Sequence, residues 1–188
     1  LGSLSDGYEQ LWKAIIRPPE LNIPYKILVV VANSGPKVYK RKGMKIERTD
    51  VEIINKEGKK LQCSHFQPLI NLADKCLVSS IFTQMLAAES KGISFALSAR
   101  IVHYLISREI TVFTFDFAGC GLSEGEYISL GFYERGDVDC AFKYLRGLGT
   151  VSSIGLWGRS MGAVTSLMYA DSNHEIGCIV LDSPFSNL

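Results

Sequence analysis

The feature that most constrains the fold is a regular alternation of apolar, β-branched runs with helically spaced segments after residue 96. The strand-like runs are 110–117, 152–157 and 176–181, and the helical segments are 96–108, 138–145 and 160–170. Continuous apolar runs of this kind are typical of strands that are buried on both faces of a sheet. Because short connections join these segments, the pattern predicts an α/β fold with a parallel sheet and right-handed crossovers.

The residues before this alternation predict a different organisation. Residues 8–16 have the pattern of a short amphipathic helix that ends at Pro18-Pro19, because proline lacks the N–H that a helix needs. The basic stretch 37–48 is interpreted as a solvated loop. We therefore divide the chain into an N-terminal helix and linker, residues 1–48, and a partial α/β domain, residues 49–188.

The α/β domain is expected to open with an antiparallel hairpin. Two β-rich runs, 51–55 and 60–67, are separated by four residues that include Gly58. Glycine supplies the positive φ that a tight turn between such strands requires.

A pentapeptide of the form G-x-S-x-G, Gly158-Arg159-Ser160-Met161-Gly162, falls between a predicted strand and a predicted helix. In that context a sharp turn places the serine at the helix N-terminus, above the carboxyl end of the sheet. Gly158 and Gly162 leave room where side chains would clash with the neighbouring strand and helix. Ser160 is thus a candidate nucleophile, and the Met161 N–H is a candidate oxyanion donor. The alternative is an incidental turn serine, and Arg159 is interpreted as a scaffold or rim residue.

Composition argues against several other classes of protein. The 188 residues are 47% hydrophobic and 21% charged, which is typical of one globular domain. A formal net charge of +1 gives no electrostatic basis for binding nucleic acid or an anionic membrane, so a neutral or lipid-like substrate fits better. The five cysteines are scattered without a C-x-x-C pair, which predicts reduced thiols in a cytoplasmic protein and no metal site. No apolar run approaches the roughly 18 to 20 residues of a membrane span.

Three stretches of the sequence resemble one protein family. FDFAGCGLSEG at 115–125, GLWGRSMGA at 155–163 and LDSPF at 181–185 resemble the α/β-hydrolase group that contains serine aminopeptidase-like proteins and their protein-depalmitoylating relatives. The residues KLQCSH at 60–65 also fit the opening strands of that group. The resemblance implies an α/β-hydrolase fold, with a mostly parallel sheet, flanking helices and an N-terminal antiparallel hairpin. It also implies that the C-terminal strands are missing, since the sequence ends directly after a predicted strand and its loop.

The same resemblance implies an activity. The chain is expected to hydrolyse an ester, a thioester or an amide through an acyl-enzyme at Ser160. The substrate is expected to be a small molecule or an acylated protein, and the full-length parent to be cytoplasmic or peripheral to a membrane. Neither a metal nor an organic cofactor is implied, and the oligomeric state stays open.

The acid and the base of the family are the first point of departure, because the family order is nucleophile, acid, histidine. Asp182 ends the strand after the nucleophile helix, so it is a candidate triad acid, with a loop-organising hydrogen-bond role as the favoured alternative. His174 follows that helix, about 15 Å from the serine at about 1.5 Å per residue, and is expected at the surface. His65 and His103 precede the nucleophile and are interpreted as structural. The catalytic acid and histidine are therefore expected beyond residue 188.

Residues 76–95 are the second departure, because the family has here a buried strand that ends in a His-Gly-type motif. The chain has LVSSIFTQML at 77–86, with poor strand character and no such motif. We interpret the segment as the product of a shifted reading frame, since another frame allows a sequence close to the family's strand and loop. A divergent loop is the alternative.

Two other functions stay open. Glycines at 119, 121 and 125 suggest a nucleotide-binding loop, but the third is one position late for G-x-G-x-x-G, and polar residues follow where that fingerprint needs a helix. The other alternative is a non-catalytic or fragmentary homologue with a binding role or none, because loss of triad partners costs on the order of 10⁴ to 10⁶ in rate.

Overall fold

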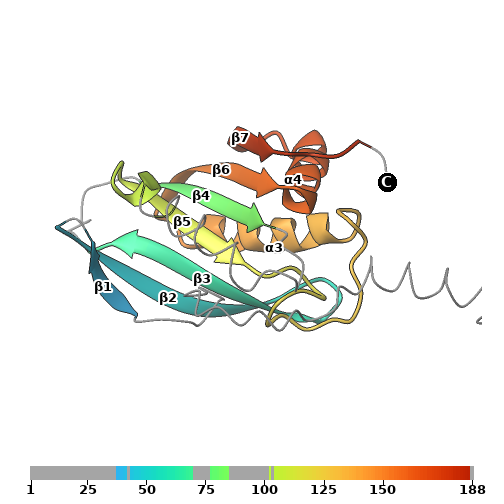
Figure 1. Ribbon diagram of the computed structural model, residues 1–188, viewed down its shortest axis with the longest axis horizontal. Coiled ribbons are helices and arrows are strands. Elements are labelled where there is room, and N and C mark those ends of the chain that lie inside the picture. Colours follow the sequence, from blue (N-terminus) through green and yellow to red (C-terminus); the bar gives the residue numbers. More distant parts are fainter. Residues whose placement is uncertain (1–36, 42, 70–76, 85–101, 103, 187–188) are drawn as a thin grey trace, which may run out of the picture.

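The computed structural model describes residues 37–186 apart from 42, 70–76, 85–101 and 103 (Figure 1). Its strands form one seven-stranded sheet in the order β1-β2-β3-β5-β4-β6-β7. The strands are β1 (Val38–Arg41), β2 (Met44–Ile54), β3 (Lys60–Pro68), β4 (Leu77–Gln84), β5 (Ile110–Phe115), β6 (Val151–Arg159) and β7 (Ile176–Asp182). The helices with assigned bounds are α3 (Glu134–Gly147) and α4 (Met161–Ser172).

The first strands of the sheet are antiparallel, as the sequence predicts. β2 and β3 pair along their length up to Ile54 opposite Lys60, and β3 then pairs antiparallel with β5. In the turn between β2 and β3, the side-chain oxygen of Asn55 accepts hydrogen bonds from the N–H groups of Glu57 and Lys59. Gly58 has φ 78°, the left-handed conformation that glycine adopts without steric cost. The predicted hairpin is therefore confirmed.

The remaining strands are parallel. β4 lies between β5 and β6 and pairs in parallel with both, and β6 pairs in parallel with β7. Helix α3 connects β5 to β6, and α4 connects β6 to β7, so the predicted alternation of strand and helix is present. In a parallel arrangement the carboxyl ends of these strands lie at one edge of the sheet, which includes Arg159 and Asp182.

Apolar side chains are buried on both faces of the sheet. Along β5, Phe113 belongs to one buried cluster and Val112 to another, because successive side chains of a strand point to opposite faces. The first cluster joins the sheet to α3 and α4 through Val138, Ala141, Phe142, Leu145, Met161 and Tyr169. The second joins it to the helical residues Val102, Leu105 and Ile106. The sheet thus lies between two layers of apolar contacts.

The segment 77–84 differs from its sequence-based description. It was expected to have poor strand character, yet it forms β4 in the middle of the sheet. Hydrogen bonds to two neighbouring strands stabilise an extended backbone here whatever the propensity of its residues. The shifted reading frame stays a hypothesis, and residues 85–95 lie outside the described residues.

The basic stretch 37–48 also differs, because it is not a solvated loop. Val38–Arg41 forms β1, and β2 begins at Met44, with Ile46 fully buried. Strand β2 therefore crosses the boundary drawn at residue 48. Lys45 is compatible with strand structure because it is exposed and is followed by the buried Ile46 in the alternation along β2. Arg48 is buried instead and pairs with Asp50 at 2.9 Å. The predicted helix 8–16 lies outside the described residues.

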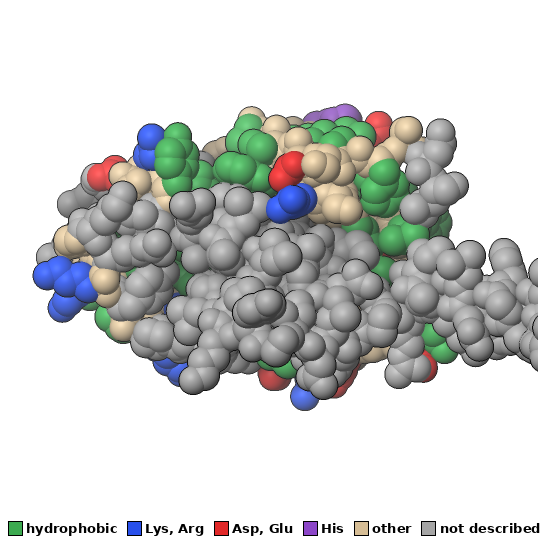
Figure 2. Space-filling view, viewed as in Figure 1, with side chains coloured by type: hydrophobic (Ala, Val, Ile, Leu, Met, Phe, Trp, Pro, Cys, Tyr) green, Lys and Arg blue, Asp and Glu red, His purple; other side chains and the backbone are tan. Residues whose placement is uncertain are grey.

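Strand β7 is more exposed than the sequence predicts. Ile179, Val180 and Leu181 have 37%, 40% and 37% of their surface exposed, although an apolar run predicts a strand that is buried on both faces. The reason is that β7 is the last strand of the described sheet and pairs only with β6. Hydrophobic side chains are visible along the side of the molecule where β7 and α4 lie (Figure 1, Figure 2).

The described cysteines, Cys63, Cys120, Cys140 and Cys178, form no disulfide with one another, and Cys76 lies outside the described residues. Burial, with a contribution from the charge of Asp116, raises the pKa of the Cys120 thiol to about 12. Within the described ranges, no group of three or more His, Cys, Asp or Glu side chains is arranged to hold a metal ion. Of the helices that the structure describes, none combines the length and the apolar character needed to cross a membrane.

We predict that His65 makes the protein less stable in mild acid. The ring is buried against Phe113, with 5.7 Å between ring centroids, and burial lowers its pKa to about 4. Between pH 6.5 and about 4 the unfolded chain binds a proton that the folded chain does not, so stability falls as pH falls through this window. Relative to His65→Leu, wild type should lose about 3 kcal/mol of unfolding free energy across it, measured by urea denaturation. The prediction would be contradicted if the unfolding free energies of wild type and His65→Leu changed with pH to the same extent.

Candidate active site

Ser160 lies at the sharp turn between β6 and α4, at the carboxyl edge of the parallel strands. Arg159 ends β6, α4 starts at Met161, and Ser160 is the N-cap residue between them. Its backbone has φ 52° and ψ −121°, a conformation that costs a non-glycine residue about 1–3 kcal/mol. The predicted strand, turn and helix around Ser160 are therefore present, with strain concentrated on the serine itself.

The close approach of β6 and α4 explains the glycine before the serine. A Cβ atom on Gly158 would lie 2.5 Å from the backbone nitrogen of Ala163 and closer still to the carbonyl group of Gly162. Backbone atoms cannot move aside as the end of a flexible side chain can, so only glycine fits this position. Gly162 is buried on the α4 side of the same contact.

The N-terminus of α4 points its first backbone N–H groups toward the same edge of the sheet. The carbonyl oxygen of Ser160 accepts hydrogen bonds from the N–H groups of Ala163 and Val164, at 3.0 and 3.2 Å. The N–H groups ahead of these, including that of Met161, precede the first intrahelical bond and carry the positive end of the helix dipole. The Met161 side chain is fully buried, which anchors this end of the helix to the core.

Asp182 is next to Ser160 in space, at the end of the neighbouring strand. In the register of β6 and β7, Arg159 is opposite Asp182, and the Ser160 N–H donates to the Asp182 carbonyl oxygen at 2.9 Å. The Asp182 carboxylate lies 3.3 Å from Nε of Arg159 and accepts a 2.8 Å hydrogen bond from the Ser183 hydroxyl. These contacts favour the loop-organising role for Asp182 over the role of triad acid.

Neither described histidine contacts these residues. His65 lies on β3, and His174 lies beyond the C-terminus of α4, which is 12 residues long and so spans about 18 Å from the end that carries Ser160. His174 is exposed, as expected, and His103 lies outside the described residues. No hydrogen bond or ion pair joins His65 or His174 to Ser160 or Asp182.

The glycine-containing loop after β5 is folded by acidic side chains. The Asp116 carboxylate accepts a hydrogen bond from the Leu122 N–H at 3.0 Å, and burial raises the pKa of Asp116. Asp137 of α3 accepts hydrogen bonds from the Ala118 N–H and from the Asn55 side chain, both at 2.8 Å, and so ties this loop to the hairpin. The next helix begins only at Glu134. Carboxylates facing the loop and the distance to the helix disfavour a nucleotide phosphate here.

The pairing of Arg159 with Asp182 was not predicted from the sequence, although both residues were candidates for the site. The signal was available, because each residue directly ends a predicted parallel strand, and adjacent parallel strands bring such positions together. No comparable signal in the sequence predicted the role of Asp137. Its partner Asn55 is distant in sequence, and its other partner, Ala118, lies in an irregular loop.

Comparison with known proteins agrees with this architecture. No family model matches the sequence. A 97-residue stretch is 34% identical to the uncharacterized protein YqkD of Bacillus subtilis, covering 47% of this chain and 30% of that protein. Among solved structures, the esterase Pf2001 of Pyrococcus furiosus matches with a TM-score of 0.64 and 26% identity, over 74% of this chain and 52% of the esterase. The chain has the α/β-hydrolase fold.

Two further α/β-hydrolase structures support the same fold. XC6422 from Xanthomonas campestris, an α/β serine hydrolase without a lid, matches with a TM-score of 0.60 and 22% identity, over 72% of this chain and 60% of that one. The α/β hydrolase GrgF from a Penicillium species matches with a TM-score of 0.61 and 21% identity, over 73% and 46%. The chain thus spans about half the length of the esterase and less than a third of YqkD.

We predict that Gly158→Ala destabilises the protein, because the added methyl group overlaps the backbone of α4. The expected loss is about 1–3 kcal/mol of unfolding free energy, the usual cost of overpacking, measured by chemical denaturation. Gly136→Ala is the matched control, since a Cβ atom at this helical glycine meets nothing within 4 Å. It should stabilise α3 by about 0.5–1 kcal/mol. Equal effects of the two substitutions would contradict the close approach at Gly158.

Proposed function

We propose that the chain carries the nucleophile of a serine hydrolase, which cleaves an ester, a thioester or an amide through an acyl-enzyme at Ser160. The observation that carries the proposal is the backbone of Ser160, held at φ 52° between a parallel strand and the helix that follows it. A strained serine in that position is typical of the nucleophile in hydrolases of this fold. The likeness to an esterase at 26% identity supports the same class of reaction.

In this proposal the Ser160 hydroxyl oxygen attacks the carbonyl carbon of the substrate. Negative charge then develops on the carbonyl oxygen, and the proposal assigns to the Met161 N–H, at the start of α4, a hydrogen bond to that oxygen. Collapse of this intermediate expels the alcohol, thiol or amine and leaves the acyl group on Ser160. Water then releases the acid and restores the serine.

The serine needs a base that accepts its proton, and the described histidines do not fit that role. Burial lowers the pKa of His65 to about 4, and this ring is packed against Phe113 rather than against Ser160. His174 lies past the far end of α4. The proposal therefore assigns only the nucleophile and one oxyanion donor to this chain, with a small molecule or an acylated protein as the substrate.

We predict that a fluorophosphonate probe labels the chain at Ser160, but much more slowly than it labels a serine hydrolase with a complete triad, because neither described histidine serves as the base. Ser160→Ala should abolish the labelling, because loss of this nucleophile costs on the order of 10⁶ in rate in related chemistry. Labelling is measured by intact-protein mass spectrometry on folded protein. Ser172→Ala, at the opposite end of α4, is the control and should label like wild type. Labelling that persists without Ser160, or no labelling of the folded wild-type chain, would favour the non-catalytic alternative.

We also predict that Asp182 positions the turn through Arg159 and is not the triad acid. Asp182→Asn and Arg159→Ala should then slow labelling to a similar extent, on the order of tenfold, and the double variant should be no slower than either. The two side chains are 43% and 35% exposed, so each substitution should change stability by less than about 1 kcal/mol. A loss on the order of 10⁴ in Asp182→Asn alone, with Arg159→Ala unaffected, would identify Asp182 as the acid instead.

A further inference from the structure

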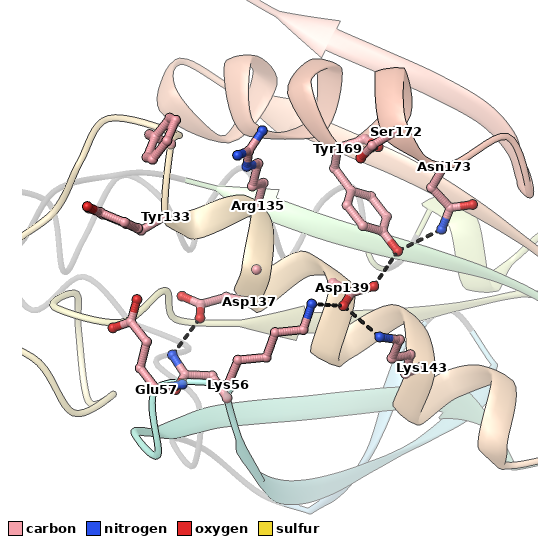
Figure 3. A pocket seen from close by; sticks show the side chains of 13 residues that line it. Lys56, Glu57, Tyr133, Arg135, Asp137, Asp139, Lys143, Tyr169, Ser172 and Asn173 are labelled. Atoms are coloured by element: carbon pink, nitrogen blue, oxygen red, sulfur yellow. Dashed lines mark hydrogen bonds and ion pairs between the residues drawn. The ribbon is translucent and has the colours of Figure 1, made fainter.

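A hollow of the molecule lies beside α3, and Ser160, Met161 and Asp182 are not among its lining residues. Its volume is about 560 Å³, and it is bounded by the β2–β3 turn, by α3 from Arg135 to Lys143 with the residues before this helix, and by the C-terminal end of α4 (Figure 3). A hollow of this size is large enough for a small organic ligand. Its walls come from three separate elements of the fold.

The centre of the pocket is one carboxylate that two lysines share. Nζ of Lys56 and Nζ of Lys143 each lie 2.8 Å from the same oxygen of Asp139 (Figure 3). The Tyr169 hydroxyl donates to the other oxygen at 3.2 Å. Burial opposes ionisation of Asp139, but the hydrogen bonds and charges of Lys143 and Lys56 outweigh it and hold the pKa of this carboxyl below its usual range. One negative charge therefore faces two positive charges.

Arg135 adds a third cation on the same face of α3. Arg135, Asp139 and Lys143 follow one another at intervals of four residues, which places them in one row on the helix. Among the described residues no carboxylate forms an ion pair with Arg135, whose guanidinium carbon lies 4.8 Å from the centre of the Phe132 ring.

The other pocket acids do not balance these cations. Glu57 pairs with Lys59 at 2.6 Å, and the oxygens of Asp137 accept hydrogen bonds from Asn55 and from the Ala118 N–H. The lining holds three cations, Lys56, Arg135 and Lys143, and three carboxylates, Glu57, Asp137 and Asp139, and Lys59 adds a fourth cation through its pair with Glu57. One positive charge is therefore in excess. Such an excess favours an anionic ligand.

The end of the pocket near Arg135 is aromatic and open. Phe132 and Tyr133 are 52% and 66% exposed, and their rings pack edge to face with 5.1 Å between centroids. Gly136 lies beside them in α3, and a Cβ atom there would meet nothing within 4 Å. No packing contact requires a glycine at this helical position. Because Gly136 has no side chain, a planar ring can lie against the surface of α3 here.

We infer that this pocket binds an aromatic phosphate monoester, with the phosphate between Lys143, Lys56 and Arg135 and the ring against Phe132, Tyr133 and the open surface at Gly136. A phosphate monoester carries a charge of about −1.5 to −2 at pH 7 and offers several acceptor oxygens to these cations. Arginine suits it further, because its planar fork binds phosphate oxygens in pairs.

The test is a titration of the ¹⁵N-labelled chain with phenyl phosphate at low ionic strength, where screening is weak. The amide signals of Arg135, Gly136 and Lys143 should shift and saturate. Inorganic phosphate should bind more weakly, because it lacks the ring, and phenol should not bind. Adenosine monophosphate and phosphotyrosine, titrated in parallel, distinguish a nucleotide from a phosphorylated tyrosine as the source of the ring.

Arg135→Ala should weaken phenyl phosphate binding about tenfold, the scale of one lost charge-assisted contact. Arg108→Ala is the matched control, since Arg108 is an exposed arginine 3.6 Å from the ring of Tyr104, outside the pocket. It should bind like wild type, as should Ser160→Ala, which separates this inference from the proposed hydrolase function. Equal weakening by Arg135→Ala and Arg108→Ala, or shifts spread over lysines elsewhere with none at α3, would overturn it.

Discussion

The rest of the structure depends on the direct backbone contact between β6 and α4. Strand β6 lies within the sheet, and α4 follows it after the single residue Ser160, so the chain reverses without a linker. This is possible only because Gly158 has no side chain where the backbone of Gly162 and Ala163 passes. Burial of Met161 and Ala163 in the core offsets the strain at Ser160. The position of the serine hydroxyl is therefore a consequence of core packing.

The same turn also depends on β7, a largely exposed strand at the edge of the described sheet. The Ser160 N–H donates to the carbonyl oxygen of Asp182, and the side chain of Asp182 reaches Arg159. Because β7 pairs on one side only and its apolar residues are partly exposed, it contributes less buried surface than the central strands. The conformation of Ser160 is thus stabilised by well-buried core contacts of α4 and, less strongly, by contacts with the edge strand β7. Burial of the exposed face of β7 would stabilise the contacts of Asp182 with Ser160 and Arg159.

The sequence predicted the elements that are specified by residues close together in the chain. The hairpin was marked by its turn, α3 by apolar residues at helical spacing, and the turn at Ser160 by two glycines at fixed positions. The sequence did not predict β4, because this strand owes its structure to hydrogen bonds with β5 and β6, which are distant in sequence. It also did not predict the exposure of β7, because an apolar run indicates a strand but not how many neighbouring strands it has. Pairings between strand ends, such as Arg159 with Asp182, require the strand order first.

The pocket beside α3 and the turn at Ser160 lie at opposite ends of one helix. Ser160 precedes the N-terminus of α4, whereas Ser172 and Asn173 at its C-terminus line the pocket. Between these ends, the hydrogen bond from Tyr169 to Asp139 fixes α4 to α3, and Asn173 donates to the same hydroxyl at 2.7 Å. Burial, opposed by the hydrogen bond from Asn173 and reinforced by Asp139, raises the pKa of Tyr169 to about 12, so this hydroxyl keeps its proton at neutral pH. The hydrogen bond from Tyr169 to Asp139 therefore forms part of the pocket and also orients α4, which follows Ser160. Substitutions of Asp139 or Tyr169 should affect both the pocket and the turn at Ser160.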